Sequence, residues 1–149
     1  MPAMFRARRV LVPVDLSPGN ERVVRAAADL VRKSRGRLLL LHVFDSRAVE
    51  DIYNLHGLRE EEVRTRMRAN AEAVLGHLRK RPWLRGLKVE QRYASGLPPA
   101  EILAAAGAWK ADLVVLARRR RAGLSYLLYG HTSDAVVRES PCAVLVLAP

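Results

Sequence analysis

The sequence predicts an α/β fold: a single-domain, open, mainly parallel five-stranded sheet with helices on both faces. Short runs rich in valine and leucine alternate with longer segments of helical periodicity, which is typical of strand–helix–strand units. Residues 9–14 form a nearly continuous apolar run, as expected of a parallel strand buried on both faces, with Pro13 near its end. At 149 residues, half of them hydrophobic, the chain fits one domain spanning residues 1–149.

A polar turn follows the first strand and leads into an amphipathic helix. We expect Ser17 or Asn20 to cap this helix, because their side chains can accept hydrogen bonds from its first N–H groups. The helical period runs to about Arg35, and Gly36 is the expected C-terminal cap. Residues 37–44 then form the second predicted strand.

The next segment, residues 46–57, has no clear period, and we expect a mobile connection there. A long helix is predicted over residues 58–80, with three glutamates, 60–62, in its first turn, where negative charge suits the helix dipole. Its apolar residues recur every three or four positions, as an amphipathic helix requires. They are Val63, Met67, Ala71, Val74 and Leu78.

The second half of the chain repeats the alternation of strands and helices. Residues 95–99 form a turn into a helix that holds Ile102 and Trp109, and Pro141 ends the last helix. The predicted strands are 87–94, 112–117 and 143–147, and the last helix covers 131–139 after a loop at 118–130.

The composition limits the classes of function. The net charge is +11, and 22 of the 26 basic residues are arginine, which is consistent with either a biased composition or a basic binding surface. The single cysteine, Cys142, excludes a disulfide within the chain. Without an apolar run long enough for a membrane span or a signal peptide, we expect a cytoplasmic protein with no membrane partner. No nucleic-acid-binding motif is present, so nucleic acid is not an expected partner.

Several catalytic and nucleotide motifs are absent. The chain has neither a P-loop nor the G-x-G-x-x-G of dinucleotide-binding proteins. Residues 123–127 resemble half of a nucleophile elbow without its closing glycine, and the histidines lack metal-like spacing. We therefore expect a protein that acts by binding, with no catalytic residues and no metal site. In an open parallel sheet, its ligand would lie beyond the carboxyl ends of the strands, near Asp15, Val43–Asp45 and Arg118–Ser133.

Five segments together carry a resemblance to a known family. They are Val12–Asp15, Leu40–Val43, Gly96–Pro98, Gly123–Ser133 and Pro141–Val146. In this order and at this spacing they resemble the universal stress proteins over essentially the whole chain. The resemblance implies the strand order 3-2-1-4-5 and a dimeric stress-response regulatory protein with as yet unknown protein partners. The last strand would be an uncharged sheet edge able to pair with a second copy. Its residues are Ala143, Val144, Leu145, Val146 and Leu147.

Members of this family that bind ATP carry the pattern G-x-x-G-x(9)-G-[ST]. With its last glycine placed on Gly130, the other positions fall on Ala117, Arg120 and His131, so one of four is kept. The resemblance still implies a degenerate site for ATP or another adenine nucleotide, with Mg²⁺ if the nucleotide binds. Its candidate residues are Pro13, Val14, Asp15, Val43, Ala117, Arg118, Arg120, Gly130, His131, Thr132 and Ser133.

Three features of this site have more than one interpretation. The four arginines at 118–121 form a solvated loop, contact nucleotide phosphates, or bind a larger polyanion. Asp15 contacts a nucleoside or stabilises the turn, and Ser133 donates to a phosphate or caps the last helix. The alternative function is therefore an ATP sensor whose arginines replace the glycines. A slow ATPase or a polyanion-binding protein is a further alternative.

Overall fold

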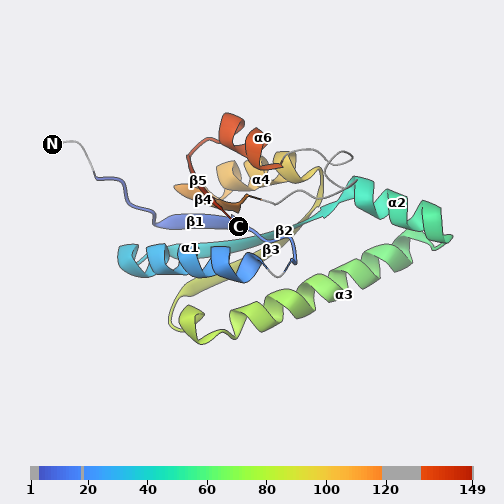
Figure 1. The fold of residues 1–149 in the computed structure, drawn as a ribbon, viewed down its shortest axis with the longest axis horizontal. Coiled ribbons are helices and arrows are strands. Elements are labelled where there is room, and N and C mark those ends of the chain that lie inside the picture. The colour runs from blue at the N-terminus through green and yellow to red at the C-terminus, as the bar shows by residue number, and fades with distance from the viewer. Residues whose placement is uncertain (1–3, 18, 119–131, 149) are drawn as a thin grey trace.

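In the computed structural model, five parallel strands form one sheet in the order β3-β2-β1-β4-β5 (Figure 1). The structure describes residues 4–17, 19–118 and 132–148. The strands are β1 (Arg9–Pro13), β2 (Arg37–Asp45), β3 (Lys88–Gly96), β4 (Leu113–Ala117) and β5 (Ala143–Leu147). The helices are α1 (Asn20–Ser34), α2 (Ser46–His56), α3 (Glu60–Arg79), the 3-10 turn η1 (Pro82–Leu84), α4 (Pro98–Ala108) and α6 (Thr132–Glu139). The predicted fold class and strand order are confirmed.

Two hydrophobic layers hold the sheet between its helices. In β2, Leu38 and Leu40 pack with the buried faces of α1 and α3, whereas Leu39 and Leu41 pack with α4 and α6. Alternate residues of a strand point to opposite faces, so a strand covered on both sides is apolar at nearly every position. This explains the continuous apolar runs of β1, β2 and β4.

The segment after β2 corrects one prediction. Residues 46–56 form the helix α2 and not an unstructured connection. Asp45 caps it, because its carboxylate accepts a hydrogen bond from the backbone N–H of Arg47 at 3.0 Å and also pairs with the Arg47 guanidinium at 2.9 Å. Val49 is its one buried residue, and Ile52 and Tyr53, three and four positions further on, are half-buried, so the apolar period is present but short.

The end of α1 corrects a second prediction. The left-handed residue that closes the helix is Arg35, with φ of 55°, and not Gly36. Gly36 serves another purpose, since a Cβ atom there would lie 2.2 Å from the carbonyl oxygen of Arg8. The glycine therefore allows the chain entering β2 to cross closely over the chain entering β1.

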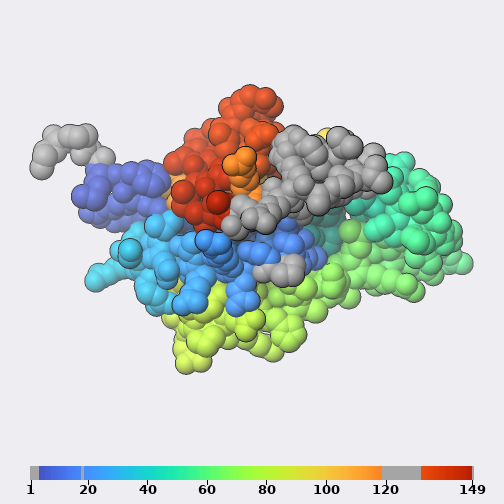
Figure 2. All heavy atoms as spheres, in the orientation of Figure 1, coloured from blue at the N-terminus to red at the C-terminus, as the bar shows by residue number. Residues whose placement is uncertain are grey.

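Within α3 the buried stripe differs slightly from the predicted one. Val63, Ala71 and Leu78 are buried as expected, but Met67 and Val74 are half-buried and Leu75 is fully buried. The helix is long and, together with α2, reaches past the sheet. The turn between α2 and α3 and the amino-terminal segment lie at opposite ends of the molecule's longest dimension (Figures 1 and 2).

Within the described ranges, no helix combines the length and the apolar character that crossing a membrane would require.

Candidate functional site

The carboxyl ends of the strands lie along one edge of the sheet, and β1 and β4 are neighbours at its centre. From β1 the chain crosses over to β2 on one side, and from β4 to β5 on the other, so strand order reverses between them. Ligands of open α/β sheets bind at such a switch point. The structure places Pro13, Val14 and Asp15 at the end of β1, with Ala117 and Arg118 at the end of β4.

The turn after β1 holds Asp15 in a fixed position. The Asp15 Oδ1 atom accepts hydrogen bonds from the backbone N–H of Ser17 at 3.0 Å and from Nδ2 of Asn20 at 2.5 Å. The Asn20 amide also donates to the Ser17 carbonyl at 3.0 Å, and its side chain is almost fully buried. Between them, Leu16 adopts a left-handed φ of 67°, which is unusual for a residue with a branched side chain. The carboxylate is thus pre-positioned by its own turn.

This network corrects the predicted cap of α1. The N-cap residue is Gly19, which has no side-chain hydrogen bond, so neither Ser17 nor Asn20 fills that role. Asn20 is instead the first residue of the helix, and its side chain reaches back to Asp15 and Ser17. Asp15 therefore stabilises the turn, as one of its two interpretations proposed.

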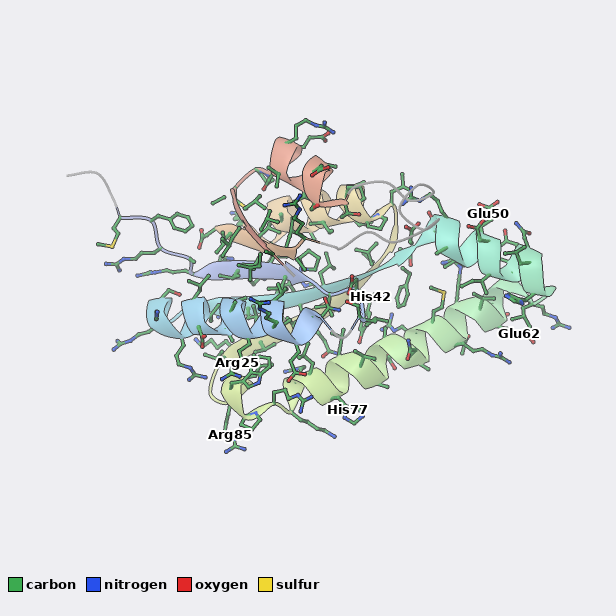
Figure 3. All side chains as sticks on the ribbon, in the orientation of Figure 1. Arg25, His42, Glu50, Glu62, His77 and Arg85 are labelled. Carbon is green, nitrogen blue, oxygen red and sulfur yellow. The ribbon has the colours of Figure 1, made fainter. Side chains whose placement is uncertain are left out.

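A buried histidine of β2 contacts the residue that follows β1. His42 lies on the side of the sheet that faces α1 and α3, and its Nδ1 atom is 2.6 Å from the Val14 carbonyl oxygen (Figure 3). Because a carbonyl only accepts, Nδ1–H is the donor of this bond. Burial lowers the pKa of His42, although the bond to Val14 and the negative charge of Asp15 oppose the shift. The imidazole also meets Phe44 edge to face at 4.8 Å between ring centres.

The ends of β2 and β3 form the apolar side of the site. Val43 and Ala94 are partners across these strands, and both are half-buried. Gly96 ends β3 with φ of 151°, and a Cβ atom there would lie 2.6 Å from Oε1 of Glu101. Pro98 is then the first residue of α4, so the G-x-P segment forms the predicted turn into a helix. Asp45 was also predicted at this end of the sheet, and its carboxylate forms an ion pair with Arg47.

The opposite side of the site is formed by the end of β4 and the start of α6. Arg118 is exposed, and its backbone N–H donates to the Leu147 carbonyl at 2.8 Å, which fixes the chain at the sheet edge. Thr132 and Ser133 are half-buried in the first turn of α6, together with Asp134. Positive potential at a helix start favours an anion, whereas a carboxylate in the same turn opposes one. The candidates Arg120, Gly130 and His131 lie outside the described residues.

The predicted dimer strand lies at an edge of the sheet. In β5, Leu145 and Val146 are each 37% exposed, Ala143 is exposed, and Val144 and Leu147 are half-buried. The strand bears no charge along its length. In the described part of the chain, no group of three or more His, Cys, Asp or Glu side chains is arranged to hold a metal ion.

Sequence reasoning missed two members of this site. Asn20 was considered only as a helix cap, although its spacing of five residues from Asp15 on a turn is the signal that could have joined them. His42 was considered only as part of a strand motif. Its contact with Val14 depends on the register of β2 against β1, in which Pro13 lies opposite Leu41.

Comparisons with known proteins agree with this architecture. The sequence matches the profile of the Universal stress protein family over residues 6–148. It is 28% identical to the universal stress protein YxiE of Bacillus subtilis over 145 residues, which cover 93% of this chain and 97% of that protein. The solved structure of the hypothetical protein MJ0577 superposes with a TM-score of 0.76 at 22% identity, covering 96% and 97% of the two chains.

Two similar solved structures contain nucleotides. One is a universal stress protein in complex with cAMP, with a TM-score of 0.60, 22% identity and coverage of 95% and 98%. The other is the universal stress protein of Archaeoglobus fulgidus in complex with dAMP, with a TM-score of 0.63, 18% identity and coverage of 96% and 98%. At these identities the likeness establishes the fold. With the family profile matched over nearly its whole length, the chain belongs to the universal stress protein family.

Proposed function

We propose that this chain is a cytoplasmic stress-response regulatory protein that binds an adenine nucleotide at the carboxyl edge of its sheet. The observation that carries the proposal is the carboxylate of Asp15, which Asn20 and the backbone of Ser17 hold at the switch point between β1 and β4. Two proteins of the same fold are known in complex with cAMP and dAMP, and this supports an adenine nucleotide as the ligand.

The nucleoside would supply most of the binding energy. A carboxylate accepts hydrogen bonds, so Asp15 suits a sugar hydroxyl or an exocyclic amine. The half-buried side chains of Val43 and Ala94 offer an apolar surface beside it, to which a purine ring could contribute a large contact area. Because the turn around Asp15 is already ordered, binding would require little rearrangement.

The phosphates would contribute less than in a protein with the full glycine pattern, of which this sequence keeps Gly130. We therefore expect AMP and ATP to bind with similar affinity. One observation favours the alternative, an ATP sensor: Arg118 is exposed at the end of β4, and three further arginines follow it. Guanidinium groups make strong paired hydrogen bonds to phosphate. In that case ATP would bind much more tightly than AMP.

Thermal unfolding with different ligands tests the proposal. A ligand at about a hundred times its Kd should add ~2.7 kcal/mol to the free energy of unfolding. For a chain of this size, each kcal/mol raises Tm by about 2 to 4 °C, so the expected shift is roughly 5 to 11 °C. AMP should produce it, and inorganic triphosphate should not.

Two variants and a salt series control this experiment. Asp15→Ala should abolish the AMP shift, whereas Asn70→Ala, an exposed asparagine on α3, should leave it unchanged. A shift given equally by inorganic triphosphate and removed by high salt would indicate a nonspecific basic surface and contradict the proposal. A shift with ATP alone would favour the sensor, and no shift with any nucleotide would leave a protein that binds other partners.

We also propose a homodimer that pairs the β5 strands of two molecules. The edge is uncharged and partly exposed, and an unprotected apolar edge strand readily pairs with another. Light scattering should give the mass of a dimer for the wild type and of a monomer for Val146→Lys. Val137→Lys introduces the same charge at an exposed residue of α6 and should remain dimeric. A monomeric wild type would overturn the dimer.

A further inference from the structure

The two ends of the molecule's longest dimension carry opposite charge. At one end, residues 48–62 at the α2–α3 turn hold five acidic residues and one arginine, and we call this segment the acidic tip. Its acids are Glu50, Asp51, Glu60, Glu61 and Glu62. Glu50 and Glu62 mark this end in Figure 3, far from the amino-terminal segment. The acidic tip also exposes a large apolar side chain, Leu55, which is 79% accessible.

The opposite end contains a groove of about 1050 Å³ with an apolar lining and a basic rim, which we call the basic groove. Its apolar residues come from the amino-terminal segment, from α1 and from the amino ends of β4 and β5. They are Met4, Phe5, Ala7, Leu30, Leu113, Val144 and Leu145. Its charged residues are Arg6, Arg8, Lys33 and Arg35, and no acidic side chain is found among the described residues that line it.

Hydrogen bonds between side chains and the backbone hold the wall of the basic groove in place. Ser34 Oγ donates to the Ala7 carbonyl at 2.6 Å, which ties the amino-terminal segment to the end of α1. The backbone N–H groups of Arg8 and Arg9 donate to Asp112 at 3.0 and 2.8 Å. Asp112 thus anchors the backbone of this wall and forms no ion pair with the charged side chains of the rim among the described residues.

The four cations of the basic groove, and Glu50 and Glu61 of the acidic tip, belong to no ion pair among the described residues. Among residues 4–17, 19–118 and 132–148, no ion pair includes Arg6, Arg8, Lys33 or Arg35. In the acidic tip, Glu60 pairs with Arg64, and Glu62 accepts from the backbone N–H of Arg59. Neither contact involves Glu50 or Glu61, which are both exposed. Each surface therefore suits a partner of opposite charge with an apolar centre.

We infer that the basic groove of one molecule binds the acidic tip of a second copy. The acidic tip complements the groove in two ways. Its carboxylates can face the four cations of the rim, and Leu55 can contact the apolar lining. The overall charge of +11 does not prevent this association, because salt screens charges more than about 10 Å apart at 0.1 M ionic strength. At contact, the local charges decide.

Contact between two different surfaces at opposite ends joins molecules head to tail. Such an interface has no two-fold symmetry and leads to open chains or rings. It differs from pairing through β5, which would use the backbone groups of the edge strand in the plane of the sheet, although the side chains of Val144 and Leu145 in β5 also line the basic groove. The basic groove lies on the face covered by α1, where Leu30 and Lys33 line it. It also does not involve Asp15, so it stands or falls independently of nucleotide binding.

Sedimentation velocity of the purified full chain tests this inference first. Concentrations up to ~1 mM would populate an interface with a millimolar Kd. At about 0.1 M salt the average sedimentation coefficient should rise with concentration. At about 1 M salt, where the screening length falls to about 3 Å, the rise should disappear. A coefficient that is independent of concentration at low salt would overturn the inference.

Two charge-reversed variants test which surfaces meet. The groove variant, Arg6→Glu with Lys33→Glu, and the tip variant, Glu50→Lys with Glu61→Lys, replace exposed side chains that belong to none of the ion pairs among the described residues. Each should weaken self-association at least ~10-fold, because reversal replaces attraction by repulsion at two positions. The control variant, Arg22→Glu with Arg25→Glu on α1, makes the same change in net charge as the groove variant and should associate like the wild type.

Mixing the two variants gives the decisive result. The groove variant keeps an intact acidic tip and the tip variant keeps an intact basic groove, so an equimolar mixture should form a complex that neither forms alone. Failure of the mixture to associate, with both variants folded by circular dichroism, would overturn the inference. Equal loss of association in the control variant would show that net charge alone controls it and would also overturn the inference.

Discussion

Replacing Asn20 by alanine removes the side chain that positions Asp15. The buried amide donates two hydrogen bonds, one to the Asp15 carboxylate at 2.5 Å and one to the Ser17 carbonyl at 3.0 Å. A bond to a charged group contributes about 1.5 to 3 kcal/mol, and a neutral one about 0.5 to 1.5 kcal/mol. Asn20→Ala should therefore lower the free energy of unfolding by about 3 kcal/mol, which lowers Tm by roughly 6 to 12 °C.

Urea and thermal unfolding measure this loss, with Asn70→Ala as the matched control. Asn70 is exposed within α3, so its replacement should change the free energy of unfolding by less than about 0.5 kcal/mol. Asn20→Ala should also reduce the AMP-induced shift, since Asp15 loses its support. If Asn20→Ala unfolds within ~0.5 kcal/mol of the wild type, the amide does not hold the turn and the reasoning about Asp15 is wrong.

Three further predictions concern the scaffold. Gly36→Ala should destabilise the fold by about 3 kcal/mol, since its Cβ would lie 2.2 Å from the backbone of Arg8. Gly107→Ala, where a Cβ in α4 would meet open space, should stabilise the fold by up to ~1 kcal/mol. Urea unfolding compares the two variants. Lys110→Gly should raise Tm slightly, by relieving a left-handed φ of 54° worth about 1 kcal/mol. Burial lowers the pKa of His42 below its unfolded value of 6.5. The contribution of neutral His42 to the free energy of unfolding should therefore be fully present above that pH and be lost as the pH falls below it. The slope is at most about 1.4 kcal/mol per pH unit, and His42→Gln should flatten it in urea titrations between about pH 7 and pH 5.

The sequence predicted the strands well because burial on both faces leaves a strong signal. The runs that form β1, β2 and β4 are apolar at nearly every position. Parallel strands in one sheet are joined by right-handed crossovers, which limits the possible strand orders. The edge strands β3 and β5 are more exposed, and there the family resemblance supplied the order.

The helix α2 could not be predicted in the same way. It buries only Val49, with Ile52 and Tyr53 half-buried, and this short apolar period lies between a cap at Asp45 and contact with α3. The role of Gly36 was also hidden, because a glycine after a helix fits a C-cap as well as a close crossing of chains. For Gly36 the deciding contact comes from Arg8, in a distant part of the chain.

For the candidate site, sequence placed the strand ends correctly but did not identify the interactions that hold them. Asp15 and Val43 follow from the fold alone, since both lie at strand ends beside the switch point. Asn20 and His42 support Asp15 and Val14 through side-chain contacts that arise from turn geometry and strand register. The opposed charges of the basic groove and the acidic tip likewise emerge only once the segments are placed in space.

The most direct test of the nucleotide proposal is to map AMP binding by the amide chemical shifts of the isotope-labelled protein. The account predicts shifts centred on Asp15, Val43 and the first turn of α6, with Asn20 responding through its bond to Asp15. Shifts confined to Arg6, Lys33 and their neighbours in the basic groove, or no shifts at millimolar AMP, would contradict it.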